Sequence, residues 1–146
     1  MRLWHTDIIK GLPRQQLLSQ WRELLAIKRT IDKQGTPNHI LVNYVIDTKI
    51  SDWKDYCNLV HSEMCDRDYN VSQNVFKELM DANISGTHNL TDYHDDTYSK
   101  ICFYNLTEKF IRGGIVPQEY NDVAKCFEKS DTNMRGIYER LINRQH

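Results

Sequence analysis

The feature that most constrains this fold is a run of leucine and tryptophan residues at helical spacing near the N-terminus. Pro13 is a favourable first-turn residue, and the pattern extends to about Ile31, after which Gly35 and Pro37 interrupt it. At about 100° per residue, one arc of this helix carries the apolar residues Leu17, Leu18, Trp21, Leu24 and Leu25. We therefore expect a helix over residues 13–31 that packs this arc on a core.

The rest of the chain also has helical patterns, so the predicted fold class is all-α. We expect a compact single domain over residues 1–146, with a long N-terminal helix and irregular loops. Only 3 Pro and 6 Gly argue against a sandwich with many turns. Further helices are expected over residues 51–68, 73–80, 95–112, 117–129 and 132–143. Ser51 is the predicted N-cap of the first of these. Residues 39–46 form either a buried extended stretch or a short helix, and residues 81–94 form a polar loop.

The composition favours a protein that stays in the cytoplasm. No apolar run is long enough to cross a bilayer, and the first residues do not lead into an apolar signal segment. The chain has four cysteines without a C-x-x-C pair, Cys57, Cys65, Cys102 and Cys126. We expect them to be reduced thiols that act as small hydrophobic residues. No metal site is expected, because no histidine pair has regular i,i+4 spacing on a predicted helix.

Positive charge is concentrated in the first quarter of the chain. The whole chain has a formal net charge of −1, but residues 1–40 hold seven basic and three acidic residues. The basic residues are Arg2, Lys10, Arg14, Arg22, Lys28, Arg29 and Lys33. This distribution predicts either a local basic surface for a polyanion or an ordinary solvated helix face.

The helix face opposite the leucines combines a few polar groups with small residues. Its members are Gln15, Ser19, Arg22, Glu23 and Ala26. Small side chains leave room for another molecule to approach, although a solvated helix has the same pattern. The first residue is only about a dozen positions upstream, and an α-amino group, with a pKa of about 7.7–8.0, is partly a neutral nucleophile near pH 7. An amine, a carboxylate and an arginine together suit imine chemistry on a sugar beside a phosphate backbone.

The stretch from Met1 to Leu25 resembles the N-terminal block of the pyrimidine-dimer DNA glycosylase family (phage-type endonuclease V). It is most similar to a branch that opens M-R-L-W-H and continues L-P-R-Q-Q-L-L. Weaker similarity continues through residues 42–45, 64–71 and 94–98. The resemblance implies a compact helical domain that cuts the glycosidic bond at ultraviolet-induced dimers. It also implies nicking of the abasic site by β-elimination, without a metal or cofactor.

The resemblance also implies roles for individual residues. Glu23 matches the catalytic carboxylate of the family, Arg22 a phosphate-contacting or catalytic-pocket arginine, and Gln15 a DNA-contacting glutamine. The nucleophile of the family is the amine exposed after removal of the first methionine. Here Arg2 follows, and methionine before arginine is normally retained, so we expect the Met1 amine to react. The catalytic candidates are therefore Met1, Arg2, Arg22 and Glu23.

The expected partner is double-stranded DNA that carries a damaged or modified base. The candidate DNA contacts are Arg14, Gln15, Gln16, Ser19, Arg22 and Arg29. His5, His39 and His94 fall in matching blocks and are further active-site candidates, although a lone histidine is more often a core or capping residue. We expect a monomer in the cytoplasm of a bacterial cell or phage-infected host, with no membrane partner. The alternative function is a non-catalytic DNA-binding protein on the same scaffold.

Overall fold

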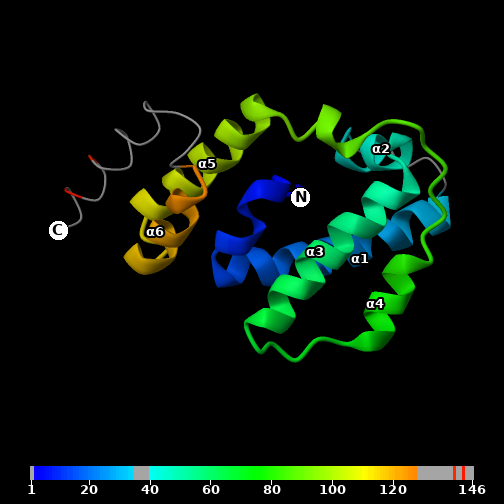
Figure 1. The fold of residues 1–146 in the computed structure, drawn as a ribbon, viewed down its shortest axis with the longest axis horizontal. Coiled ribbons are helices and arrows are strands. Elements are labelled where there is room, and N and C mark those ends of the chain that lie inside the picture. The colour runs from blue at the N-terminus through cyan, green and yellow to red at the C-terminus, as the bar shows by residue number, and fades with distance from the viewer. Residues whose placement is uncertain (1, 35–39, 128–139, 141–142, 144–146) are drawn as a thin grey trace.

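The computed structural model describes residues 2–34, 40–127, 140 and 143, and every regular element in these ranges is helical (Figure 1). The elements are η1 (Thr6–Gly11), α1 (Arg14–Gln34), α2 (Ile40–Asp47), α3 (Ile50–Asp66), α4 (Gln73–Met80), η2 (Leu90–Asp92), α5 (Asp96–Ile111) and α6 (Pro117–Lys125). An isolated bridge between Thr48 and His88 is the one extended pairing seen in those ranges. The predicted all-α class is confirmed.

The helix expected over 13–31 is α1, and it begins directly after Pro13, whose carbonyl accepts the Leu17 N–H at 3.0 Å. A side chain of α6 caps the N-terminus of α1, because the Arg14 N–H donates to Glu119 Oε2 at 2.7 Å. A carboxylate at this end also complements the helix dipole. Residues far apart in sequence therefore fix the start of α1.

The buried face of α1 is rotated from the predicted leucine arc. Leu17 and Leu24 are fully buried as expected, but Leu18 and Leu25 are only half-buried. Gln20 is fully buried instead, because the first residues of the chain pack against that flank and give its side chain a hydrogen-bond partner. The predicted arc contained apolar residues only, so it did not include Gln20.

The segment expected to be extended or a short helix is the helix α2. The next helix, α3, begins at Ile50 with Lys49 as its N-cap, so the prediction of Ser51 as the N-cap is wrong. The side chain of Asp52 in its first turn instead accepts the Leu90 N–H at 2.8 Å. The acidic first turn thus serves to bind a distant loop.

The polar stretch 81–94 is a loop as expected, apart from the short helix η2, and it is tied to the end of α2. The His88 N–H donates to the Asp47 carbonyl at 2.9 Å, and the His88 carbonyl accepts the Lys49 N–H at 2.9 Å. A Cβ atom at Gly86 would lie 2.1 Å from the Asp47 backbone, so only glycine permits this close approach.

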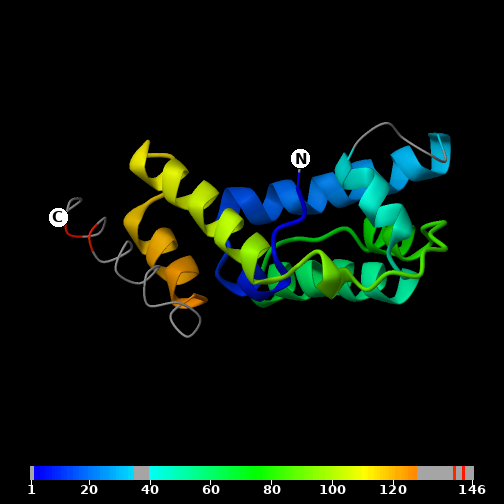
Figure 2. The same ribbon diagram turned by 90° about the horizontal axis from the view of Figure 1, so that it is seen from above.

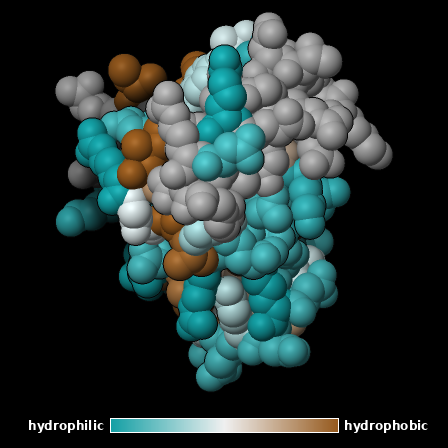
Figure 3. All heavy atoms as spheres, turned by 90° about the vertical axis from the view of Figure 1, so that its left-hand side faces the viewer, coloured by the Kyte–Doolittle hydropathy of each residue, from teal (hydrophilic) through white to brown (hydrophobic). Residues whose placement is uncertain are grey.

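α5 and α6 close one end of the core. Phe110 and Tyr120 stack with ring centroids 4.2 Å apart. Between the two helices, Gly113 has a φ of 81°, the left-handed conformation that glycine commonly adopts just after the end of a helix. Figure 3 faces this end and shows a narrow hydrophobic strip between hydrophilic side chains. Ile111 at the end of α5 and Val116 before α6 are exposed. The predicted helix over 132–143 lies outside the described residues, apart from positions 140 and 143.

α1 packs against α3 and α4, and α6 packs against η1. Figure 2 shows α1 along one side of the molecule and α3 along the other, with the N-terminal end beside α1. Among the described residues, no helix is long and apolar enough to cross a membrane. The arrangement leaves the outer face of α1 next to the start of the chain.

Candidate active site

α1 holds the N-terminal segment, residues 2–5, through two side chains. Glu23 Oε2 accepts the Arg2 backbone N–H at 3.3 Å, and Gln20 Oε1 accepts the Trp4 N–H at 2.7 Å. The two acceptors are three positions apart and hence neighbours on the helix. The backbone at the start of the chain therefore lies over Glu23.

α3 and α5 hold the same segment from the other side. The Tyr98 hydroxyl donates to the Leu3 carbonyl at 2.6 Å, and the Tyr56 hydroxyl donates to the Trp4 carbonyl at 2.6 Å. Burial raises the pKa of both phenols well above the usual tyrosine value, so both stay protonated and keep donating. The N-terminal segment is thus bound to three helices.

His5 and His94 anchor the point where the N-terminal segment enters η1. His5 Nδ1 accepts the Asp7 N–H at 3.1 Å, so Nε2 carries the proton and donates to the His94 carbonyl at 2.8 Å. His94 Nδ1 accepts the Thr6 N–H at 3.2 Å, and Nε2 lies 3.4 Å from the Tyr44 hydroxyl. Both imidazoles are buried and use both nitrogens in these contacts.

The environment of His94 favours its neutral form. Burial, reinforced by the neighbouring His5, lowers its pKa to about 3, and Asp95 opposes this only in part. A proton on Nδ1 would also remove the acceptor for the Thr6 N–H. Near pH 7, His94 is therefore a neutral structural contact.

A pocket of about 340 Å³ opens where the N-terminal segment meets α1 and α5. It is lined by Arg2, Trp4, Gln15, Gln16, Ser19, Glu23, Asn105 and Lys109. All but Trp4 and the two α5 residues are site candidates from the sequence, and the structure brings them together here. The Arg2 guanidinium carbon lies 5.2 Å from the centroid of the Trp4 ring, a cation–π contact. The pocket thus combines one carboxylate with two cationic side chains.

Sequence reasoning missed Asn105 and Lys109. They are four positions apart on α5, and Asn105 Nδ2 donates to the Ile101 carbonyl at 2.8 Å. The i,i+4 spacing places both on one helix face. Only the packing of α5 across the N-terminal segment brings that face opposite Glu23, so no local sequence signal could have found it.

The other predicted basic contacts do not gather at this pocket. Arg22 is exposed beside it, with Nη2 3.2 Å from the Ser19 hydroxyl. The Arg14 guanidinium carbon lies 5.2 Å from the centroid of the Tyr69 ring. Arg29 forms an ion pair with Glu78 at 2.9 Å. Neither Arg14 nor Arg29 lines the pocket. Met1 and His39 lie outside the described residues.

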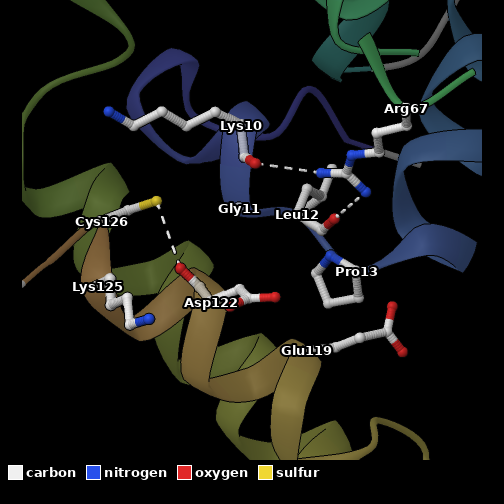
Figure 4. A pocket seen from close by; sticks show the side chains of 9 residues that line it. All are labelled: Lys10, Gly11, Leu12, Pro13, Arg67, Glu119, Asp122, Lys125 and Cys126. Carbon is white, nitrogen blue, oxygen red and sulfur yellow. Dashed lines mark hydrogen bonds between the residues drawn. The ribbon is translucent and has the colours of Figure 1, made fainter. Parts of the chain in front are cut away.

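A larger hollow of about 540 Å³ lies between η1 and α6 (Figure 4). Its arginine is already engaged, because Arg67 donates to the Leu12 carbonyl at 2.9 Å and to the Lys10 carbonyl at 3.2 Å. Its Glu119 caps α1. These groups join helices, so this hollow is weaker as a reaction site than the pocket at Glu23.

No cluster of three or more His, Cys, Asp or Glu side chains suited to a metal ion occurs in the part of the chain that the structure describes. The candidate site is built from the N-terminal segment, α1 and α5. Its notable geometry is the start of the chain facing a carboxylate, with an arginine and a lysine nearby.

The fold and pocket define a helical protein whose N-terminal backbone lies over a carboxylate in a partly cationic pocket. A family model for pyrimidine dimer DNA glycosylase matches residues 1–77, and the chain belongs to this family. It is thus a DNA repair glycosylase in the broad sense, with DNA as its class of substrate. Searches of curated proteins and of solved structures returned no match. The family match covers η1 to α3 and α4 as far as Lys77, whereas α5 and its pocket residues lie beyond it.

Proposed function

We propose that this protein excises damaged or modified bases, including pyrimidine dimers, from double-stranded DNA and then cuts the strand at the abasic site. The N-terminal amine is the nucleophile, and Glu23 moves the protons. No cofactor takes part.

The observation that carries the proposal is the 3.3 Å contact between the Arg2 backbone nitrogen and Glu23 Oε2. With Met1 retained, the reactive amine is joined to this nitrogen through only two backbone carbons. With Met1 removed, the Arg2 nitrogen is itself the amine. In both forms the amine belongs either to Arg2, which contacts Glu23, or to the residue directly before it. One residue advances the chain by about 3.8 Å between Cα atoms, so the amine stays close to Glu23.

The chemistry follows from a neutral amine next to a carboxylate. The amine attacks C1′ of the deoxyribose, the C1′–N bond to the base breaks, and the base leaves with the electron pair and takes up a proton. The nitrogen on C1′ then loses one proton, and the C1′–O4′ bond breaks with its electron pair staying on O4′, which takes up a proton. This gives a protonated C1′ imine on the opened sugar. Glu23 then takes a proton from C2′, and the C3′–O bond breaks with its electron pair leaving on the phosphate. Water hydrolyses the imine and restores the amine.

The remaining pocket groups bind the DNA. Arg22, which contacts the pocket residue Ser19, and Lys109 on α5 are cations that suit phosphates flanking the lesion. Gln15 and Ser19 are polar residues that line the pocket. A lesion weakens base stacking, which makes extrusion of the base less costly.

The test uses duplexes with one cis-syn thymine dimer, with one abasic site, or with no lesion. We expect cutting of the first two at the lesion without added metal, and no cutting of the third. Binding of the damaged duplexes without cutting would support the alternative, a non-catalytic DNA-binding protein. If no duplex is bound even at low salt, assignment of DNA as the partner fails.

A further inference from the structure

Two polar atoms at the pocket are shielded from solvent and lack a hydrogen-bond partner. They are Arg2 Nη1, a donor, and Gln16 Oε1, an acceptor, and neither bonds to any residue within the described ranges. Buried polar atoms in proteins are nearly always paired. Both residues line the pocket and are half-buried, so each unpaired atom belongs to a side chain that a ligand in the pocket would contact.

The Arg2 guanidinium lies against an aromatic ring and near two neutral side chains. It packs on the ring of Trp4, which is 6% exposed. Tyr98 and Cys102 also lie near it, the Cys102 thiol in a hydrogen bond with the Arg2 side chain, and burial raises the pKa of both groups, so they stay neutral. Glu23 is the carboxylate that lines the same pocket. A guanidinium N–H without a partner favours a ligand atom that accepts a hydrogen bond.

The presence of one unpaired donor and one unpaired acceptor restricts the chemical class of ligand that suits the pocket. A phosphate offers only acceptors, so it would satisfy Arg2 but bring negative charge towards Gln16 Oε1 and the Glu23 carboxylate. The imide edge of a thymine or uracil presents a carbonyl oxygen beside an N–H. This edge carries one partner for each of the two unpaired atoms.

We infer that the pocket reads the imide edge of the target pyrimidine, with Arg2 donating to a carbonyl oxygen and Gln16 accepting from N3–H. The inference rests on the proposed function and adds the feature of the base that is recognised. Thymine keeps this edge in a cyclobutane dimer, because the dimer forms through C5 and C6. Recognition through N3–H therefore fits the substrate of the family.

A structural alternative exists for Gln16. Gln20 Nε2 is the third shielded atom without a partner in the described part of the chain, and it lies one turn further along α1. A rotated Gln16 could accept from Gln20 and would then have a purely structural role. Substitutions at Gln16 separate the two roles, because only a base contact changes discrimination between substrates.

The experiment compares two duplexes that differ by one methyl group. Both carry a cis-syn thymine dimer, which is either unmodified or methylated at N3 of the 5′ thymine. Affinities are measured by fluorescence polarisation with the Glu23→Gln variant as the background, so that no substrate is consumed. We expect this background to bind the unmodified dimer at least about tenfold more tightly, since methylation removes the donor and adds bulk. Adding Gln16→Leu should reduce the ratio towards one, whereas Gln16→Glu keeps an acceptor oxygen and should preserve it.

Equal affinity for the two duplexes overturns the inference, as does a ratio that Gln16→Leu leaves unchanged. No preference of the background protein for the dimer over undamaged DNA also overturns it. If Gln16→Leu fails to fold, Gln16→Met takes its place, because methionine keeps the side-chain length without the amide oxygen. Unchanged discrimination in a folded Gln16→Met would assign Gln16 to the structural contact with Gln20 and overturn the inference. Cutting of abasic-site DNA by the wild type tests the proposed function separately, because that substrate has no base to read.

Discussion

At the scale of single residues, the proposed chemistry depends most on Glu23. It is half-buried in the pocket and touches the backbone of Arg2 at the chain start. We expect Glu23→Gln to slow strand cutting at an abasic site by about 100-fold or more, the usual contribution of a positioned general base. The free energy of unfolding should change by less than about 0.5 kcal/mol, because the amide keeps an acceptor oxygen and the shape is unchanged.

The matched control is Glu108→Gln on α5. Glu108 is exposed and forms an ion pair with Arg112 at 2.7 Å, away from the pocket lining. Gel assays of strand cutting and urea unfolding curves on both variants measure the two effects. If Glu23→Gln cuts at the rate of Glu108→Gln, or if it unfolds, the catalytic assignment is wrong.

The lowered pKa of His94 predicts how the free energy of unfolding depends on pH. Its pKa is about 3 in the folded protein against an ordinary 6.5, so between these values the unfolded chain binds a proton that the folded chain does not. Stability is therefore fully present above pH 6.5 and falls as the pH drops towards 3, by up to about 1.4 kcal/mol per pH unit. Urea unfolding at pH 7 and pH 5 should show a larger loss in the wild type than in His94→Gln. Equal losses would exclude this role.

At the scale of elements, the N-terminal segment depends on donors from other helices. Tyr98→Phe removes the 2.6 Å hydrogen bond to the Leu3 carbonyl and leaves that buried acceptor unpaired. We expect a loss of about 1–3 kcal/mol in unfolding free energy, together with slower cutting because the amine is held less firmly over Glu23. The control is Tyr93→Phe, whose hydroxyl lies 3.4 Å from exposed His88. Equal effects of the two variants would contradict this positioning role.

Helix periodicity predicted most elements, including α1, α4 and α5, because an apolar stripe is a local property of the chain. The predicted start of α3 was wrong, because Lys49 and not Ser51 is the N-cap. The side chain of Asp52 binds the Leu90 N–H of a distant loop. The helix η1 had no local signal: its N-cap is the side chain of His5, which is fixed by contact with α5's preceding loop at His94. The start of α3 and the helix η1 depend on contacts between residues far apart in the sequence, which helix periodicity cannot predict.

At the scale of the whole molecule, the basic N-terminal quarter does not form one continuous DNA-binding surface. Lys28 is buried in an ion pair with Asp32, and Arg29 is paired with Glu78. The candidate catalytic face was predictable because Glu23, Ser19 and Gln15 share one side of a helix. The contribution of α5 to the pocket was not predictable. Asn105 and Lys109 are about 80 positions from Glu23 in the sequence and reach the pocket only through tertiary packing.

Salt dependence of DNA binding tests this view of the surface. Arg22→Ala removes an exposed cation at the pocket rim, so the slope of log affinity against log salt should become shallower by about 0.9, the value for one phosphate contact. Lys54→Ala is the control, because Lys54 is exposed on α3, along the opposite side of the molecule (Figure 2). Identical slopes for the two variants would show that Arg22 makes no phosphate contact.

The most direct test of the central claim is borohydride trapping on abasic-site DNA, followed by peptide mapping of the adduct and intact-mass measurement of the free protein. The N-terminal amine is the nucleophile in this account, so we predict a covalent adduct on the first residue, Met1 if the mass shows that it is retained. Lys109 lines the same pocket and Lys10 lies near the chain start, so both are competing amines. An adduct on either lysine, or no adduct from protein with a free N-terminus, would contradict the account.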